Sequence, residues 1–557
     1  MRLSQSLLIC SVTMWSHLSL KMAPFYIFQL GIGMNILRNK RLVGAMLFTA
    51  TTGMTVASAQ TVTAVMHSGL RMMDPIQSTA FITREHGYMI YDTLVGIDSN
   101  FKVQPQMADW EVLDDGKVYR FTLRDGLKWH DGTPVTSEDC IASIKRWLDN
   151  DNTGPVLKDF LADTKIVDDQ VFELHLTEAA SLMLDSLAKI SSRPAFMMPK
   201  RIVEEANEKA VSEMIGSGPF KFVQSEFRPG VKVVYEKNTD YVPRDEPADW
   251  TSGGKQVNVD RVEWVSMPDA MTSANALINE EVDFIEKFPF DLLPLVENMP
   301  GITAKVIDPL GNWSYYRFNH KHPPFDNKLV RQAAMYAVGQ EDVMKALVGN
   351  ADYYSTCASP FGCGTPNATD YGKEMIISAN AKKAKELLAE ASYDGTPVVL
   401  LHPTDHVMAS PQPVVIASAL KAAGFTVDMQ SMDWQSVVTR RSNANEPAQG
   451  GWGIFATYGI VAASGDPFAN TTIAANGKDA WFGWPDVPEI EALRLEYARA
   501  TDDQSKQATA AKIQEFVVDE GVIVPLGQFR TPAAFRNTLQ NIPEAPITVF
   551  WGLEKNS

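Results

Sequence analysis

The chain alternates between helix and strand signals, and this order decides its class of fold. Residues 413–423 favour a helix, and Gly424 follows where a left-handed cap is expected. Apolar side chains then recur at every second position up to residue 429, the period of a strand. Further helices are predicted over residues 380–391 and 503–518. Helices that alternate with strands are typical of α/β lobes, so we expect an α/β fold.

The length of the chain requires more than one domain. A chain of 557 residues exceeds the size at which a single hydrophobic core stops growing, so two or three domains are expected. Hydrophobic residues make up 45% of the sequence and charged residues 21%. This balance suffices for large cores and argues against long disordered stretches.

A compact run of strand and turn signals lies in the first quarter of the chain. Residues 117–124 alternate between apolar and polar side chains, and Asp-Gly pairs punctuate the region as tight turns. Thr136 stands three positions before Asp139, which is the spacing of a capping box. Apolar residues then recur at helical spacing from Cys140 to Leu148. The region predicts a β-meander that leads into a helix.

Residues 34–59 have the three parts of a secretory signal peptide. Basic residues at 38–41 precede an apolar stretch over 42–56, and the Ala-Ser-Ala run at 57–59 has the small-x-small pattern of a cleavage site. The apolar stretch is too short, and too rich in glycine, threonine and alanine, for a membrane anchor. We therefore expect cleavage, with Gln60 as the first residue of the mature protein.

Residues 1–33 precede this complete signal peptide. The preferred interpretation is that translation begins at Met34, and a real N-terminal extension is the alternative. No cysteine follows the cleavage site, so no lipid anchor is expected there. A freely diffusing protein is retained where an outer membrane encloses it, which predicts a Gram-negative periplasm. No other segment reaches the length of a membrane span.

The acidic balance of the chain restricts its partners. The formal net charge is −17, and every charged residue of the first 59 is a lysine or an arginine, so cleavage makes the mature protein more acidic still. Nucleic acids and anionic membrane surfaces repel such a protein. We expect no nucleic-acid partner.

Three cysteines remain after cleavage. Cys357 and Cys363 share a loop rich in proline and glycine. In an oxidising compartment they can close a small disulfide loop, and two free thiols are the alternative. The pair lacks further ligands nearby, so zinc is not expected there. Cys140 lies on the apolar face of its predicted helix and is expected to be inert.

Two short motifs invite a catalytic or nucleotide-binding interpretation, and a turn explains each of them better. His130 beside Asp131 could be a general base, yet Trp-His-Asp-Gly is also typical of a turn between strands. The Gly-Ser-Gly run at 216–218 lacks the helix and acidic residue of a dinucleotide site. The sequence contains no P-loop, G-x-S-x-G or H-E-x-x-H pattern. We therefore expect no catalytic residue, no cofactor and no metal.

The segment WEVLDDGKVYRFTLRDGLKWHDGTPVTSEDC at residues 110–140 carries the most specific pattern of the chain. Further stretches accompany it in order, namely residues 72–98, 216–241, 262–286, 318–338 and the terminal block after Trp481. Together they resemble the family 5 extracellular solute-binding proteins, whose members receive peptides, nickel chelates, opines and other solutes. The resemblance covers nearly the whole mature chain.

This resemblance implies a type II periplasmic-binding-protein fold, with two lobes around a ligand cleft and an extra third domain. The ligand would lie between domains I and III, which would close over it by hinge motion at crossings near 315–320 and 519–525. The implied divisions are residues 60–95, 216–315 and 523–557 for domain I, 96–215 for domain II and 316–522 for domain III.

The resemblance also implies a transport role. A periplasmic receptor of this family would capture a peptide or peptide-like solute as a monomer and deliver it to an ABC permease for import. The permease would contribute two transmembrane subunits and two ATP-binding subunits. Alternatives within the class are an opine, a sugar-like compound or haem as the solute. An exported hydrolase and a peptide-binding chaperone are the alternatives from other classes.

Candidate ligand contacts are mostly aromatic. Receptors of this type hold solutes with apolar walls and a few polar anchors, so a group of tryptophans and tyrosines in one region is suggestive. Packing in the core is the ordinary explanation for any single member. The group consists of Trp434, Trp452, Tyr458, Trp481 and Trp484.

The charged anchors of a free peptide are missing from the positions that match the family. Peptide-binding members commonly hold the amino terminus with an aspartate three positions before an Asp-Pro pair, and here Ala463 stands three positions before Asp466. Several dipeptide binders hold the carboxylate with an arginine after a strand that matches residues 398–406, but no arginine occurs from there to residue 439. Possible substitutes are Arg71, Arg440, Arg441 and Asp466.

Overall fold

The computed structural model describes residues 60–207 and 209–556. The predicted signal peptide at 34–59 and residues 1–33 before it lie outside this part. Among the described residues, no helix combines the length and the apolar character that a membrane crossing requires.

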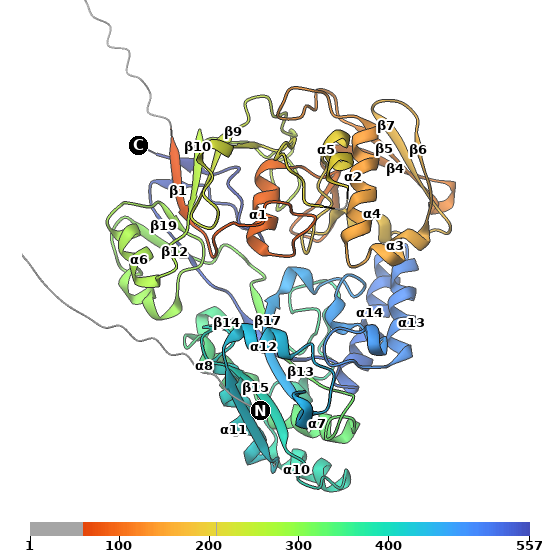
Figure 1. The fold of residues 1–557 in the computed structure, drawn as a ribbon, viewed down its shortest axis with the longest axis vertical. Coiled ribbons are helices and arrows are strands. Elements are labelled where there is room, and N and C mark those ends of the chain that lie inside the picture. Colours follow the sequence, from red (N-terminus) through yellow and green to blue (C-terminus); the bar gives the residue numbers. More distant parts are fainter. Residues whose placement is uncertain (1–59, 208, 557) are drawn as a thin grey trace, which may run out of the picture. The chain divides into compact units, whose positions relative to one another are not determined.

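The first sheet has seven strands and mixed direction (Figure 1). In spatial order they are β12 (Ile302–Lys305), β19 (Ala533–Arg536), β11 (Phe284–Ile285), β1 (Thr61–Val65), β10 (Arg261–Val265), β9 (Lys232–Lys237) and β8 (Phe220–Phe222). The strand β1 pairs in parallel with β10 on one side and with β11 on the other. Between β10 and β11 the chain forms helix α6 (Ala270–Ile278). The two strands run in the same direction on either side of β1, so the chain needs a crossover connection to pass from one to the other.

The second sheet has six strands. In spatial order they are β14 (Tyr354–Ser355), β18 (Val524–Phe529), β13 (Asn312–Phe318), β17 (Ile454–Ile460), β15 (Val398–Pro403) and β16 (Val427–Met432). Its helices include α7 (Lys328–Ala337), α8 (Gln340–Leu347), α10 (Ala381–Glu390) and α11 (Pro411–Ala422). The predicted helices α10 and α11 are confirmed, and Gly424 has the expected positive φ, 99°, before the chain enters β16.

The third sheet has four strands and lies in the region that the chain inserts between β1 and β8. Because β5 pairs with β7 and not with β6, the sheet differs from the simple meander that the sequence predicted. Its order is β4 (Ala108–Leu113), β5 (Val118–Leu123), β7 (Val171–Leu176) and β6 (Leu161–Ile166), all antiparallel. The predicted capping box is present at the start of α2 (Ser137–Asn150), where Thr136 and Asp139 bond each other's backbone. The remaining helices of this region are α3 (Gly154–Phe160), α4 (Leu182–Ala188) and α5 (Lys200–Ala206).

Two crossings connect the first sheet to the second. One runs from β12 to β13 through residues 306–311, and the other from β18 to β19 through residues 530–532. Because β13 and β18 pair with each other, the crossings lie side by side. At Gly311, which has a φ of 65°, a Cβ would stand 2.4 Å from the carbonyl oxygen of Phe529, so this approach requires glycine.

The crossings differ from those expected near 315–320 and 519–525. The first expected position falls inside β13, and the second falls before most of β18, so the chain returns to the first sheet only after Phe529. The sequence predicts a strand over residues 522–529, but the pattern of its apolar side chains does not indicate which sheet the strand joins.

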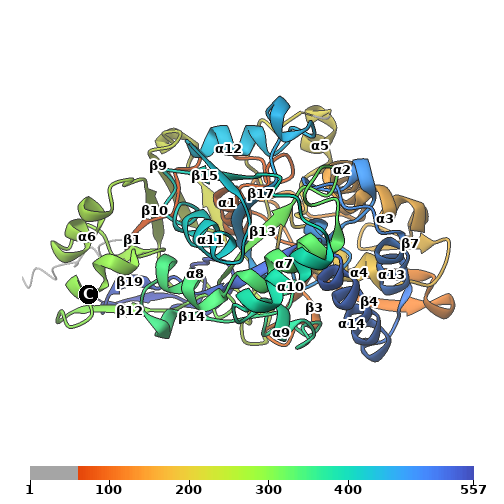
Figure 2. The same ribbon diagram turned by 90° about the horizontal axis from the view of Figure 1, so that it is seen from below.

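The inserted region contacts two helices that the chain forms between β17 and β18 of the second sheet, α13 (Pro488–Arg499) and α14 (Asp503–Asp519). Figure 1 and Figure 2 both place these helices next to α4. An ion pair joins Lys506 of α14 to Asp185 of α4, at 2.5 Å. Two more ion pairs cross the same boundary, Arg499 with Glu178 and Lys102 with Asp503. Opposite charges therefore hold the inserted region against these helices.

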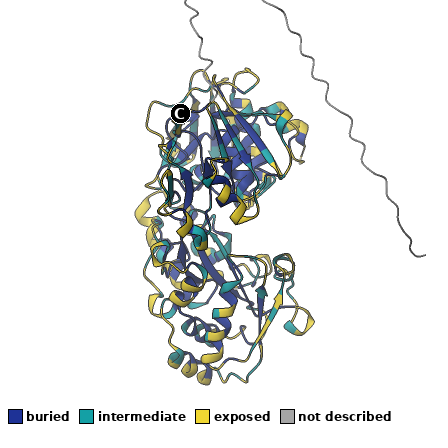
Figure 3. Cartoon of the chain, turned by 90° about the vertical axis from the view of Figure 1, so that its left-hand side faces the viewer, coloured by how far each residue is buried: buried dark blue, intermediate teal, exposed yellow. Residues whose placement is uncertain are grey.

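Strands β13 and β18 are buried along their whole length, and many exposed residues lie on the outer helices (Figure 3). Trp147, Trp452 and Trp551 are among the largest side chains that are fully buried. Cys140 is a buried free thiol. Cys357 and Cys363 are joined in a disulfide, with their Cα atoms 5.7 Å apart.

Candidate functional site

Arg441 lies in a cage of aromatic side chains beside the second sheet. It follows helix α12 (Trp434–Arg440), whose first turn is capped by Asp433 through the backbone N–H of Ser436, at 3.0 Å. Figure 2 shows α12 beside β15 and β17. The guanidinium carbon of Arg441 lies between 5.3 and 5.8 Å from the ring centres of Trp434, Phe455, Trp481 and Phe482. At such distances the rings attract the cation through their π faces.

The charge of Arg441 has no counter-ion among the residues that the structure describes. No carboxylate lies within ion-pair distance of its guanidinium, and its buried Nε atom has no hydrogen-bond partner. Burial lowers the pKa of Arg441, while the nearby Tyr315 acts in the opposite direction. An arginine nevertheless stays protonated at neutral pH. A desolvated, unpaired guanidinium is suited to bind a carboxylate from outside the chain.

Two further tryptophans, Trp452 and Trp484, pack beside the cage. Trp452 is fully buried, and its indole N–H donates to the carbonyl oxygen of Arg441 at 3.0 Å, which fixes the backbone from which the guanidinium projects. Trp484 packs against Trp452, with ring centres 5.8 Å apart. Trp452 therefore packs within the fold, whereas Trp484 is partly exposed and lines another cavity, together with His320 and Lys321.

A histidine extends the aromatic surface at one edge. The ring of His406 lies 4.8 Å from that of Trp434 and 5.4 Å from that of Tyr458. Its buried Nδ1 atom has no hydrogen-bond partner. Burial lowers the pKa of His406, so the neutral ring is favoured, and its free nitrogen can bond a polar group of a ligand.

A cavity of about 460 Å³ lies where the inserted region meets α13 and α14. The turn after β17 forms one wall and includes Ala463 and Asp466. One oxygen of Asp466 accepts the backbone N–H groups of Phe468 and Ala469, at 2.7 and 2.9 Å. Burial raises the pKa of the Asp466 carboxyl. A cavity of this size is within the range of small-molecule sites in proteins.

The lining of this cavity also includes Lys189 of the inserted region and Tyr497. Lys189 forms an ion pair with Asp151, and burial lowers its pKa. Tyr497 comes from α13, and its hydroxyl oxygen accepts a hydrogen bond from the side chain of Asn367, at 3.0 Å. The cavity thus combines polar anchors from the inserted region with others from the second-sheet side.

The structure brings six of the eight predicted site residues into one cluster. Trp434, Arg441, Trp452, Trp481 and Trp484 share one cluster, and Tyr458 joins it through His406. Asp466 lines the separate cavity. Arg71 lies on the first-sheet side, exposed, where a Cβ on Gly230 would stand 3.0 Å from its Nε atom.

Sequence reasoning missed several residues of the surface. Phe455 and Phe482 complete the cage, and Tyr315 packs 6.4 Å from Trp481. Phe455 follows Trp452, a predicted site residue, by three positions, and His406 directly follows an acidic residue after β15. Both positions are only weak indications of a role in a site. Only the fold shows that these side chains meet.

The two motifs interpreted as turns have structural roles. The Nδ1 atom of His130 accepts the backbone N–H of Gly216, and its Nε2 atom donates to the carbonyl oxygen of Gly218. A Cβ at Gly216 would lie 1.8 Å from the carbonyl oxygen of Ile90. His130 and the glycines thus close a tight contact between segments, in line with the prediction of turns.

Two sheets with adjacent crossings, and a third sheet inserted between strands of the first, define a class: the type II periplasmic-binding-protein fold with an additional domain. Residues 102–480 match the model of the bacterial extracellular solute-binding proteins, family 5. The chain belongs to this family, which consists of solute-binding proteins.

Relatives and solved structures agree with this membership. A probable peptide ABC transporter periplasmic-binding protein of Sinorhizobium fredii, y4tO, is 37% identical over 90% of this chain and 94% of its own length. A structure of AgaA from A. tumefaciens R10, in complex with agropinic acid, has a TM-score of 0.72, 21% identity and coverage of 89% of this chain and 99% of its own. A dipeptide-binding protein of Pseudoalteromonas sp. SM9913, in complex with Met-Leu, also has a TM-score of 0.72, with 19% identity over 89% of this chain and 100% of its own.

Proposed function

We propose that this protein captures a peptide or peptide-like solute with a carboxylate and delivers it to an inner-membrane ABC permease. The permease would have two transmembrane and two ATP-binding subunits, and the receptor would act as a monomer in a Gram-negative periplasm. Family membership supports the role of receptor. The name of the Sinorhizobium relative, which shares 37% of its residues with this chain, supports a peptide as the solute.

The caged Arg441 carries the proposal for the solute's chemistry. Its guanidinium is stacked, largely desolvated and without a counter-ion among the described residues, so it is prepared for a carboxylate. The rings of Trp434 and Trp481 would form apolar walls, and His406 would supply a polar contact at the edge. Affinity would come from burying the solute on this surface with few charged contacts.

The amino end of a peptide would be held differently from the way common in the family. Ala463 occupies the position of the usual aspartate and lines the cavity of about 460 Å³. Asp466, three residues later, is the acid on the same wall, and one of its oxygens is already engaged by backbone N–H groups. We therefore propose Asp466 as a secondary anchor and Arg71 as a contact from the first-sheet side.

Closure of the lobes would convert binding into a signal. We propose domain I as residues 60–95, 216–311 and 530–557, domain II as 96–215 and domain III as 312–529, which moves both crossings to the segments between the sheets. The adjacent segments 306–311 and 530–532 would be the hinges. A permease that prefers the closed form would then receive loaded protein selectively.

Native mass spectrometry of the protein from its own periplasm tests this proposal. The protein would be denatured afterwards and the released molecules identified. Short peptides or acylated amino acids with a free carboxylate would support it. A neutral solute, such as a sugar, would keep the receptor role and exclude the carboxylate anchor. Protein that is empty and hydrolyses added peptides would exclude the receptor role altogether.

A further inference from the structure

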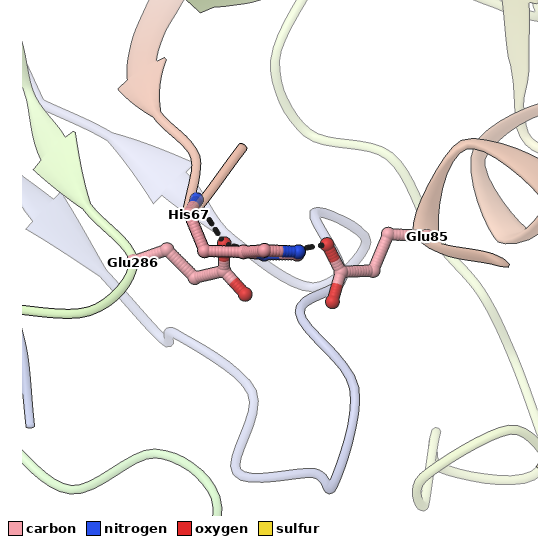
Figure 4. Close-up of side chains that lie close together, drawn as sticks. All are labelled: His67, Glu85 and Glu286. Carbon is pink, nitrogen blue, oxygen red and sulfur yellow. Dashed lines mark hydrogen bonds and ion pairs between the residues drawn. The ribbon is translucent and has the colours of Figure 1, made fainter. Parts of the chain in front are cut away.

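Three side chains from distant parts of the chain converge in the first-sheet lobe (Figure 4). The Nδ1 atom of His67 lies 2.8 Å from a carboxylate oxygen of Glu286 and 3.6 Å from one of Glu85. One nitrogen and two carboxylate oxygens, one from each residue, lie within 4.8 Å of one another. Both glutamates are buried. The sequence predicted none of the three as a site residue, and none belongs to the arginine cage.

The topology explains the convergence. His67 follows the end of β1, and Glu286 follows the end of β11, which pairs with β1 in parallel, so both side chains emerge at the same edge of the sheet. The backbone N–H of Glu286 donates to the carbonyl oxygen of Val65, at 3.0 Å, which continues the pairing up to the cluster. Glu85 comes from helix α1 (Phe81–Ile90), across from this edge. The carboxyl edge of parallel strands is a common place for ligand sites.

Neighbouring groups form hydrogen bonds with both carboxylate oxygens of Glu286, but they leave one carboxylate oxygen of Glu85 without a hydrogen-bond partner. One oxygen of Glu286 accepts the Thr548 hydroxyl at 3.0 Å, and the other accepts the backbone N–H of His67 at 2.8 Å. Oε1 of Glu85 lies 3.4 Å from the guanidinium of Arg84. Oε2 of Glu85, the atom that faces His67, is buried and has no hydrogen-bond partner. A buried carboxylate oxygen without a partner is costly, so something is expected to satisfy it.

We propose that His67, Glu85 and Glu286 bind a divalent transition-metal ion of the Zn²⁺ type. One imidazole nitrogen and two carboxylate oxygens are a donor set that such ions accept, with water in the remaining position. An adjoining cavity of about 30 Å³ has room for about one water molecule. The hydrogen bonds to Glu286 act as the outer contacts that hold a metal ligand in place.

The surrounding charges make this a site of moderate affinity. Arg84 and Lys287 line the same cavity and oppose a cation, while Asp308 and the two glutamates favour it. The competing occupant is a proton on His67, which would then lie between the two carboxylates as an imidazolium.

The location suggests a structural use of the ion. The cavity is also lined by Ile307 and Asp308 of the first crossing, Thr531 of the second and Ile460 at the end of β17. An ion here would lie beside the segments between the sheets, and its binding does not depend on the identity of the solute.

Zinc binding to the untagged protein, stripped with EDTA and then dialysed, tests the proposal. ZnCl₂ is titrated calorimetrically, and the bound zinc is counted by inductively coupled plasma mass spectrometry. The expected result is one Zn²⁺ per chain. Glu85→Gln, nearly equal in shape, and His67→Asn should each weaken binding at least tenfold. Glu297→Gln, an exposed glutamate of the same lobe, is the matched control and should bind like the unaltered protein.

The proposal is overturned if zinc does not bind at one equivalent, or if both variants bind it as tightly as the control. Circular dichroism shows whether each variant folds. If a variant does not fold, Co²⁺ added to the unaltered protein gives a separate measurement. Strong visible absorption bands, abolished by competing Zn²⁺, are expected of a low-coordinate site, and weak bands typical of the hydrated ion contradict the proposal.

Discussion

The guanidinium carbon of Arg441 lies 5.5 Å from the ring centre of Trp481, and no carboxylate among the described residues pairs with it. Trp481 also lies beneath a second arginine, Arg317, whose guanidinium carbon is 5.0 Å from the ring centre. Arg317 is fully buried and donates to the carbonyl oxygens of Phe482 and Thr472, so its charge is used within the fold. This difference is the reason that we propose Arg441, and not Arg317, as the contact for a carboxylate of the solute.

Arg441→Lys should weaken solute binding at least tenfold, about 1.4 kcal/mol. Lysine keeps the positive charge but loses the planar fork that stacks on rings and binds a carboxylate with two hydrogen bonds. The measurement is calorimetric titration with the solute that native mass spectrometry identifies. Arg201→Lys, the same exchange at a half-exposed residue of α5, is the control. Equal affinity in the two variants would remove Arg441 from the site.

Local patterns in the sequence predicted the elements well because their causes are local. The capping box at Thr136 and the cap at Gly424 depend on residues within one turn, and both are present. The arginine cage is different, because Phe455, Trp481 and Arg441 approach one another only after β17 and the loops around it have folded. Composition indicated an aromatic surface, but it could not separate the buried Trp452 from the partly exposed rings of Trp434 and Trp481.

The metal-ligand cluster was beyond sequence reasoning for the same physical reason. His67 and Glu286 are separated by 219 positions, and they meet because β1 and β11 become parallel neighbours. No short spacing announces such a site, unlike the metal-binding motifs that lie on one helix or one loop. Pairing between distant strands must be known first.

Asp185→Lys should loosen the contact between the inserted region and α14. It would place a second cation opposite Lys506, where an ion pair now measures 2.5 Å between partly buried groups. The double variant Asp185→Lys/Lys506→Asp restores opposite charges and should recover the contact, with a coupling energy on the order of 1 kcal/mol. Small-angle X-ray scattering, which reports the radius of gyration, compares the three proteins.

Salt provides the control for this prediction. The pairs Arg499–Glu178 and Lys102–Asp503 are more exposed, so high ionic strength should weaken them and enlarge the radius of gyration of the unaltered protein slightly. If the single and the double variant scatter alike at low salt, then this ion pair does not hold the regions together.

Acid should destabilise the protein partly through His130. Burial lowers the pKa of this ring to about 4, although its hydrogen bond to Gly218 acts in the opposite direction. An unfolded histidine has a pKa of about 6.5. Between these values the unfolded chain binds a proton and the folded chain does not, so stability is complete above pH 6.5 and falls as the pH decreases towards 4. The slope for one such group is at most about 1.4 kcal/mol per pH unit.

Urea unfolding at several pH values measures this effect. In His130→Gln the amide can accept the N–H of Gly216 and donate to Gly218, as the neutral ring does, but it does not titrate. The variant should therefore lose stability less steeply between pH 6.5 and 4. Parallel pH profiles for the variant and the unaltered protein would contradict the assignment.

Lys255→Met should destabilise the fold by about 3–5 kcal/mol. The ammonium of Lys255 lies 2.7 Å from Asp92, and the side chains are 0% and 1% exposed. Removing the lysine leaves a buried carboxylate that keeps the backbone N–H of Thr93 at 3.0 Å, the hydroxyl of Tyr241 at 2.8 Å and a longer contact to Gln106. Lys255→Met/Asp92→Asn removes both charges and should recover part of the loss, because an amide is far cheaper to bury than an unpaired carboxylate.

The exposed pair Lys158–Asp149, at 47% and 62% exposure, is the control, and Lys158→Met should change the free energy of unfolding by less than about 0.5 kcal/mol. Equal effects of the two lysine substitutions in urea titrations would mean that burial of the Lys255–Asp92 pair contributes nothing to stability.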